Sequence, residues 1–230
     1  MKYFDLDGNS FEIDEIKERE FLGRGKAAVV YKTIFDFKNK LENLALKDYR
    51  AYPLWLCPDT KRVFENYKAI KSLGLETWKI FLISEDKNKF LMENGNENGR
   101  LVGTFYNDNN GVFTKYFAKE ENKIGNIPNF DSFSSKIFND IKLLSISKIR
   151  ITEDTYFFSF KENHNGESDL EYIFADFDNV KLNYNGENLF EKNIQSFLNA
   201  FREGLLPCLK EDKSDYYISE IEGTVNLLNK

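Results

Sequence analysis

The sequence predicts a bilobal α+β fold, on three observations. Strand-like runs separated by turns fill residues 17–50, a single helix-like segment follows over 59–74, and most other helix-like segments lie in the second half. With 230 residues, of which 41% are hydrophobic, the chain can build one domain or a small two-lobed one. We therefore expect a five-strand antiparallel lobe with one helix over residues 1–93 and a reduced, mainly helical lobe over residues 94–230.

The first lobe is expected to begin with a three-strand meander, because short runs rich in β-branched and aromatic residues alternate with turns. These runs are residues 20–22, 28–32 and 44–47. Asp59 can cap a helix whose apolar residues keep helical spacing until Gly74 ends it. Residues 78–84 and 89–92 flank a short charged turn, which predicts an antiparallel hairpin.

The second lobe is expected to follow a polar, glycine-containing linker at residues 94–100. Periodicity predicts a turn, a helix, a hairpin of two aromatic strands and a final helix there. In chain order these segments are residues 107–111, 132–146, 156–160 paired with 171–177, and 187–209.

Composition excludes several classes of protein. The 32 basic and 38 acidic residues give a net charge of -6, which disfavours a nucleic-acid partner. Cys57 and Cys208 are far apart and His164 is the single histidine, so a Cys/His zinc site cannot form. The cysteine usage favours a reducing, cytoplasmic location, although secretion as an effector stays open. We expect no signal peptide, because the N-terminal residues include acidic ones where a basic flank and an apolar run are required. We also expect no membrane span, because no run approaches about 18 apolar residues.

A glycine-rich segment is the first candidate for chemistry. Gly23, Gly25 and Ala28 fit G-x-G-x-x-[GA]-x-V, with Val30 in the last place. Glycines at such a turn let backbone amides approach a phosphate closely. A dinucleotide-binding fingerprint requires a helix directly after the glycines, whereas Val29 and Val30 continue as a strand. The strand-loop-strand form resembles the glycine-rich loop of protein kinases.

Further motifs extend the resemblance to protein kinases. Ala45 and Lys47 are similar to the A-x-K of the kinase strand whose lysine contacts the nucleotide phosphates. Glu65 lies in the expected helix, where the resemblance implies a glutamate that forms an ion pair with Lys47. The expected hairpin resembles the following two kinase strands, and the resemblance then implies backbone hydrogen bonds to adenine at Met92, Glu93 and Asn94.

The segment after the second hairpin carries the implied metal site. Ala175, Asp176, Phe177 and Asp178 resemble the D-F-G motif, with Asp178 in the glycine place. The resemblance implies that Asp176 binds Mg²⁺ and that the ligand is ATP.

The catalytic loop departs from the kinase pattern H-x-D-x-x-x-x-N. When the loop is aligned on a strand that begins at Tyr156, Arg150 takes the place of the base and Thr155 that of the metal-binding asparagine. Arginine does not deprotonate in proteins, and a threonine hydroxyl is a weaker magnesium ligand than an amide carbonyl. We expect the Arg150 guanidinium to contact the γ-phosphate or a neighbouring carboxylate. A shift in register would instead bring Asp154 toward the base position.

Three functions follow from this pattern. The first is a protein-kinase-like ATP-binding protein with a degenerate catalytic loop, either a pseudokinase or an atypical phosphotransferase. The second is an active minimal Ser/Thr kinase that uses Asp154 and Asp176, with Lys47 and Glu65. The third is an interaction module that kept the fold and lost the nucleotide. Residues 179–186 leave no room for an ordinary activation segment, which resembles minimal kinases of bacterial effectors and toxin systems. A protein partner or protein substrate is expected.

Overall fold

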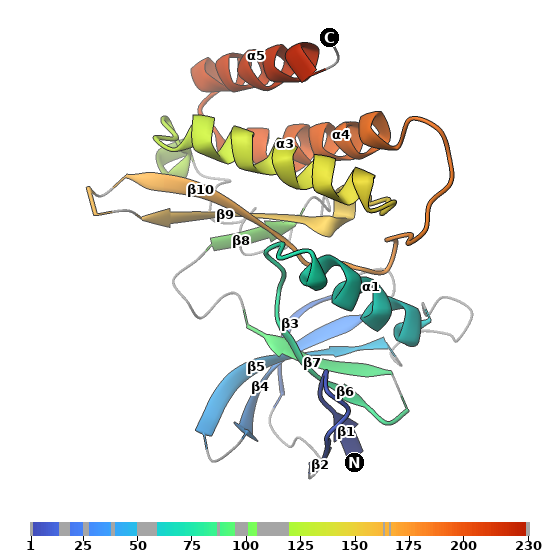
Figure 1. Cartoon of the computed structure of the whole chain (residues 1–230). Coiled ribbons are helices and arrows are strands. Elements are labelled where there is room, and N and C mark those ends of the chain that lie inside the picture. The colour runs from blue at the N-terminus through green and yellow to red at the C-terminus, as the bar shows by residue number, and fades with distance from the viewer. Residues whose placement is uncertain are drawn as a thin grey trace. The chain divides into compact units, whose positions relative to one another are not determined.

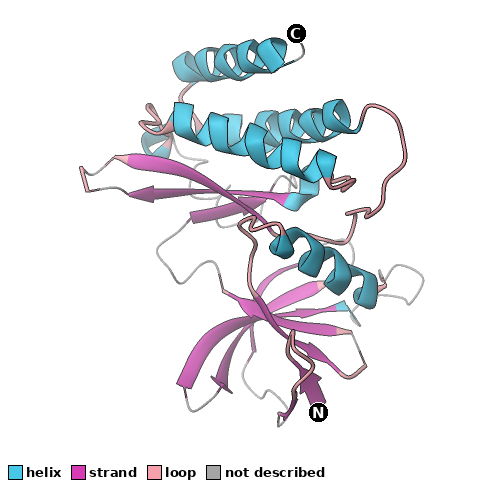
Figure 2. Cartoon of the chain, in the orientation of Figure 1, coloured by secondary structure: helices cyan, strands magenta, loops and turns pink. Residues whose placement is uncertain are grey.

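A computed structural model describes most of the chain, with gaps. The described residues are 2–13, 19–24, 28–37, 40–49, 59–86, 88–94, 101–104, 120–162, 164–165 and 167–228. The chain forms two compact units, called here unit 1 (Met1–Glu65 with Trp78–Asn98) and unit 2 (Asn66–Thr77 with Gly99–Lys230). One division between them therefore falls inside helix α1 (Thr60–Ser72). Figures 1 and 2 show the elements of each unit.

Unit 1 contains a seven-stranded sheet in the order β2-β1-β6-β7-β5-β4-β3, with every pair antiparallel. Its strands are β1 (Lys2–Phe4), β2 (Ser10–Glu12), β3 (Arg19–Arg24), β4 (Val29–Phe37), β5 (Lys40–Asp48), β6 (Ile80–Ser84) and β7 (Lys89–Glu93). The expected meander is confirmed as β3-β4-β5, and the expected hairpin is confirmed as β6-β7.

The expected count of five strands is wrong, because β1 and β2 add a hairpin beside β6. The Asp5 carboxylate stabilises the turn between them by accepting hydrogen bonds from the backbone N–H of Asp7 (3.0 Å) and Asn9 (2.8 Å). Gly8 adopts a positive φ of 87°, which glycine tolerates without strain. Strands of three residues are too short for an alternating pattern to stand out in the sequence.

Helix α1 begins and ends as predicted. Asp59 Oδ1 accepts hydrogen bonds from the backbone N–H of Lys61 (3.1 Å) and Arg62 (3.4 Å), which satisfies donors that the first turn leaves without partners. The helix ends just before Gly74, whose φ is 78°.

Unit 2 contains a three-stranded antiparallel sheet and three complete helices among its described residues. The elements are β8 (Leu101–Thr104), α3 (Phe130–Ile146), β9 (Tyr156–Glu162), β10 (Ser168–Phe174), α4 (Leu189–Ala200) and α5 (Glu211–Leu228). The predicted aromatic hairpin is β9-β10, and the predicted helix over 132–146 is α3. The turn expected at 107–111 lies outside the described residues.

The final helix was predicted too long. After α4 the chain forms a π-helical turn (Phe201–Leu205) and a 3-10 turn (Leu206–Cys208), and a separate helix, α5, follows. Pro207 in the 3-10 turn explains why a regular helix does not continue, since proline lacks the donor and clashes with the preceding turn. Strand β8 and helix α5 were not predicted. None of the helices in the described residues is both long and apolar enough to cross a membrane.

Aromatic side chains join the layers of unit 2, in which α3 and α4 cover the sheet and α5 lies beyond them (Figure 1). Phe133 of α3 lies with its ring centroid 5.6 Å from Tyr172 on β10 and 6.4 Å from Phe197 on α4. Tyr217 of α5 packs against Phe130 at a centroid distance of 4.5 Å. Aromatic burial therefore dominates this core, as the composition predicts.

Candidate functional site

The β9-β10 hairpin brings two of the predicted catalytic residues, Asp154 and Asp176, to the same end of the sheet. Asp154 lies in a 3-10 turn (Glu153–Thr155) directly before β9, and Asp176 follows β10. The register pairs the first residue of β9 with the last of β10, and the Ala175 N–H donates to the Thr155 carbonyl at 3.0 Å. The two carboxylates are close enough for the charge of Asp176 to act on the pKa of Asp154.

Asp154 is half-buried, and this burial is the main reason that its pKa is raised above the ordinary value. The Thr152 hydroxyl donates to Oδ1, and Asn179 Nδ2 donates to Oδ2 at 2.7 Å. Both hydrogen bonds favour the ionised form and lower the pKa, whereas the charge of Asp176 raises it. The net shift is upward, so Asp154 holds its proton more strongly than a solvated aspartate does.

The Arg150 side chain forms hydrogen bonds in the described part of the chain, but none of them is with Asp154 or Asp176. Its Nη1 atom donates to Asn193 Oδ1 at 3.2 Å and to Ser196 Oγ at 2.9 Å, both on α4. Partial burial lowers the pKa of the guanidinium. Of the two contacts that we expected for the guanidinium, the hydrogen bond with a neighbouring carboxylate is not found among the described residues, where Asn193 and Ser196 of α4 are its partners. The contact with the γ-phosphate stays a prediction.

Asn193 is fully buried and holds the segment that leads into the candidate site. Its Oδ1 also accepts from the Ile151 N–H at 3.1 Å, and its Nδ2 donates to the Ile149 carbonyl at 3.0 Å and to Ser145 Oγ at 3.1 Å. A buried amide with this many partners fixes the backbone beside it. Sequence reasoning missed Asn193, because an asparagine inside a helix gives no signal of distant backbone partners.

Asn66 holds the turn that follows Asp176 by hydrogen bonds to its backbone, as Asn193 holds the segment before Asp154. It is 1% exposed, and its Nδ2 donates to the carbonyls of Phe177 (2.9 Å) and Val180 (3.0 Å). The Phe177 ring lies edge-on to Tyr67 at a centroid distance of 5.4 Å. The part of α1 that belongs to unit 2 therefore fixes the turn after Asp176 through one amide and one aromatic contact.

Asp176 and Asp154 each offer a carboxylate, the kind of oxygen ligand that a hard cation prefers. Thr155, the other predicted metal ligand, is fully buried, and its hydroxyl has no hydrogen-bond partner in the part of the chain that the structure describes. No group of three or more His, Cys, Asp or Glu residues suited to a metal ion occurs among the described residues. The metal role of Asp176 and Thr155 stays a prediction.

The glycine-rich segment of unit 1 joins two paired strands. Strand β3 ends at Arg24 and β4 begins at Val29, and these two residues are register partners. Gly23 is in β3 and Ala28 is buried, whereas Gly25 lies outside the described residues. The chain therefore continues as a strand after the glycines, as we predicted from Val29 and Val30, and no helix begins there.

Lys47 lies on the face of the sheet that the first half of α1 covers. Its register partners are Val30 on β4 and Phe90 on β7, and such partners point to the same face. Phe64 of α1 stacks on Phe90 at a centroid distance of 6.4 Å. The Lys47 side chain is half-buried, with Nζ 5.0 Å from the centre of the Tyr49 ring.

The remaining predicted site residues of unit 1 are less well placed for the ion pair with Lys47 and for hydrogen bonds to adenine. Glu65 is exposed, and no ion pair joins it to Lys47 in the described part of the chain. Ala45 and Met92 are buried register partners in the ladder. The Glu93 N–H donates to the Lys79 carbonyl at 2.8 Å, so this donor already has a partner. Buried Asn94 follows directly.

Neither a scan against protein-family models nor a search of the curated proteins finds a match for this chain. The function is therefore inferred from the residues of the chain itself.

Proposed function

We propose that the chain is a protein-kinase-like ATP-binding protein with a degenerate catalytic loop, a pseudokinase or an atypical phosphotransferase. The observation that carries this proposal is the β9-β10 hairpin, which brings Asp176 close to Asp154 in the acidic turn before β9. By the resemblance, Asp176 corresponds to the aspartate of the D-F-G motif. In protein kinases this aspartate binds the Mg²⁺ that accompanies ATP. Asp176 would accordingly hold the metal ion.

Unit 1 supports the proposal independently. Gly23 lies in β3, which pairs with β4, and Lys47 lies on the sheet face covered by the first half of α1, where the resemblance implies a lysine that contacts phosphates. An active kinase also requires a glutamate from this helix to pair with the lysine. The exposed position of Glu65 therefore favours a protein that binds nucleotide over one that transfers phosphate rapidly.

The hydrogen bonds of Arg150 support the proposal that the catalytic loop is degenerate. Its guanidinium is hydrogen-bonded to α4, and arginine cannot accept a proton from a substrate hydroxyl. The residue in the aligned base position thus has a structural role.

One observation favours the active minimal Ser/Thr kinase as a second candidate. Asp154 has a raised pKa and lies close enough to Asp176 to be affected by its charge. A carboxylate with a raised pKa is a better general base near neutral pH. In this second candidate Asp154 would accept the proton while Asp176 holds the metal.

Calorimetric titration of the full chain with ATP, with and without Mg²⁺, tests the proposal. We expect binding that Mg²⁺ strengthens, and we expect this strengthening to disappear in Asp176→Asn. The matched control is Asp215→Asn, an exposed aspartate on α5 in the same unit, which should bind as the original chain does. A chain that binds no ATP under either condition would be the interaction module.

Transfer of labelled γ-phosphate separates the two candidates. The first predicts slow or undetectable transfer, because loss of a general base costs about 10²- to 10⁴-fold in rate. Rapid transfer that disappears in Asp154→Asn and survives in Arg150→Lys would establish the second.

A further inference from the structure

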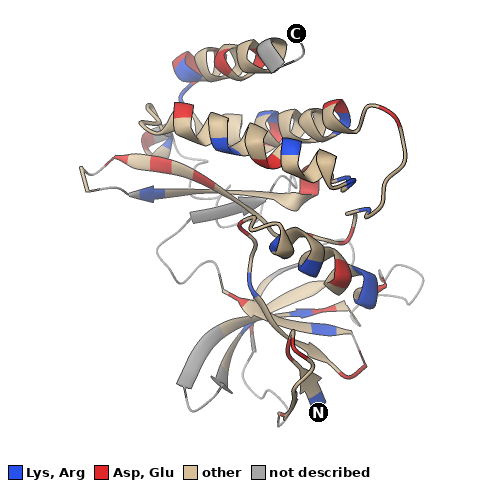
Figure 3. Cartoon of the chain, viewed as in Figure 1, with Lys and Arg blue, Asp and Glu red and all other residues tan. Residues whose placement is uncertain are grey.

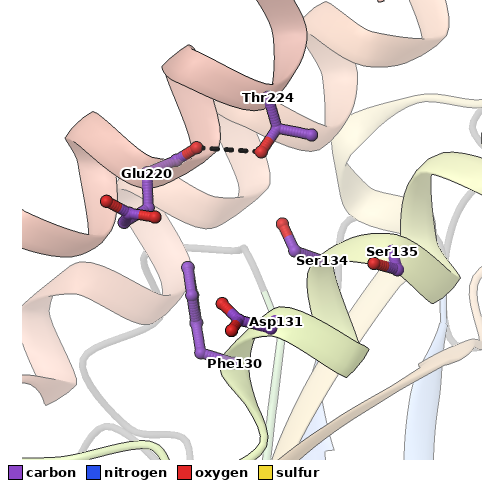
Figure 4. A pocket seen from close by; sticks show the side chains of 6 residues that line it. All are labelled: Phe130, Asp131, Ser134, Ser135, Glu220 and Thr224. Carbon is purple, nitrogen blue, oxygen red and sulfur yellow. Dashed lines mark hydrogen bonds between the residues drawn. The ribbon is translucent and has the colours of Figure 1, made fainter. Parts of the chain in front are cut away.

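A hollow of about 210 Å³ lies between α3 and α5 within unit 2 (Figure 4). One water molecule takes up about 30 Å³ in the liquid, so the hollow has room for a chain of several heavy atoms. Six residues line it: Phe130, Asp131, Ser134, Ser135, Glu220 and Thr224.

The hollow is acidic. Asp131 lies in the first turn of α3 and Glu220 lies on α5, and both are exposed. Neither carboxylate has an ion-pair or hydrogen-bond partner among the residues that the structure describes. No lining residue is basic. Acidic residues also outnumber basic ones along α5 (Figure 3), so the surroundings favour a cation.

A buried hydroxyl points into the same hollow. Ser134 is 7% exposed, and its Oγ has no hydrogen-bond partner in the described part of the chain. Figure 4 shows this oxygen directed from α3 toward α5 and Thr224. A buried polar atom without a partner is costly, so this one indicates a ligand that is not part of the chain.

Thr224 adds a hydrogen-bond acceptor to the lining, and Phe130 adds an apolar surface. Thr224 Oγ1 donates its proton to the Glu220 carbonyl at 3.0 Å, which leaves the hydroxyl oxygen able only to accept. Phe130 forms the apolar part of the lining and is fixed by its contact with Tyr217.

We propose that this hollow binds an aliphatic primary ammonium group. An ammonium has three N–H donors and no acceptor, which matches a lining of two carboxylates and three hydroxyl oxygens. The methylene carbons of its stem would contact the Phe130 ring. A divalent ion fits less well, because the lining offers two carboxylates from separate helices and otherwise only neutral hydroxyls. A lysine side chain of a partner protein and a small free diamine share the proposed chemistry.

Backbone amide NMR of the full chain, titrated with cadaverine and in parallel with Nα-acetyl-lysine amide, tests the proposal. We expect saturable shifts at Ser134 and Thr224 with a Kd on the order of 1 mM. Asp131→Asn and Glu220→Gln should each weaken binding roughly three- to fivefold, as is typical of exposed ion pairs. Asp215→Asn removes an exposed charge from the same helix outside the lining and should leave the Kd unchanged.

Two comparisons complete the experiment. Tighter binding of cadaverine supports a free amine as the ligand, and tighter binding of the lysine amide supports a protein lysine. The proposal is overturned if neither probe gives saturable shifts, if uncharged 1,5-pentanediol binds as well as cadaverine, or if Mg²⁺ or Ca²⁺ shifts the same residues at lower concentration. These titrations contain no nucleotide, so their outcome is independent of ATP binding.

Discussion

The two units differ in how they hold the segments that carry the candidate chemistry. In unit 1 Gly23 and Lys47 lie in β3 and β5, and these two strands pair with β4, which lies between them in sequence. In unit 2 the segments before β9 and after β10 are largely irregular, and the buried amides of Asn193 and Asn66 hold them. Backbone ladders between neighbouring strands are a local property of the chain, whereas the amide contacts join residues far apart in sequence.

The cores of the two units differ as well. In unit 1 one core cluster is mostly aliphatic and includes Leu44, Leu46, Leu82 and Leu91. In unit 2 the ring of Phe197 is fully buried and its centroid lies within 6.4 Å of the centroids of four other rings. These rings belong to Phe133, Phe138, Tyr156 and Phe201. A single position in unit 2 thus joins α3, α4 and the sheet.

The largest expected effects come from truncating one core residue in each unit. Phe197→Ala should lower the free energy of unfolding by about 3–5 kcal/mol and Leu46→Ala by about 2–5 kcal/mol, because both side chains are fully buried. Hydrogen exchange followed by mass spectrometry should locate the loss of protection in α3, α4 and β9 for Phe197→Ala, and in β4, β5 and β7 for Leu46→Ala. Equal loss of protection in both units after either change would show that the two cores unfold together.

A smaller effect is expected from Asn193→Ala. The change leaves the Ile151 N–H and the Ile149 carbonyl without their partner in a buried region, which should cost roughly 2–3 kcal/mol. Urea unfolding measures this difference. Gln195→Ala, an exposed position on the same helix, should change stability by less than about 0.5 kcal/mol. If the two variants were equally stable, the amide would not be what holds the segment before β9.

The smallest expected effect is a dependence of stability on pH. The pKa of Asp154 is raised above its ordinary value of 3.8, so the folded chain binds this proton more strongly than the unfolded chain does. The resulting stabilisation is present at low pH and is lost as the pH rises from about 3.8 through the folded-state pKa. The free energy of unfolding, measured across this range for the original chain and for Asp154→Asn, should fall with pH by more in the original chain. A difference that is constant with pH would contradict the raised pKa.

Regular elements with a clear period could be predicted from the sequence. Strands β4 and β5, helix α1 and the β9-β10 hairpin each carry enough alternating or helical positions to be recognised locally. Strands β1 and β2 could not be recognised, because each has only three residues and forms by pairing at the edge of a sheet. The count of five strands was wrong for this reason.

The sequence by itself determined the α+β class, the strand that follows the glycines and the places of Lys47 and Asp176 relative to their strands. These properties depend on the period of apolar residues and on turn residues, which act over a few positions. Only the tertiary structure decided that Arg150 binds α4, that Asn66 and Asn193 hold the two irregular segments, and that α3 and α5 enclose an acidic hollow. Each of these features depends on contacts between residues far apart in sequence. A buried polar side chain can form such hydrogen bonds only where packing has excluded water and brought donors and acceptors within reach.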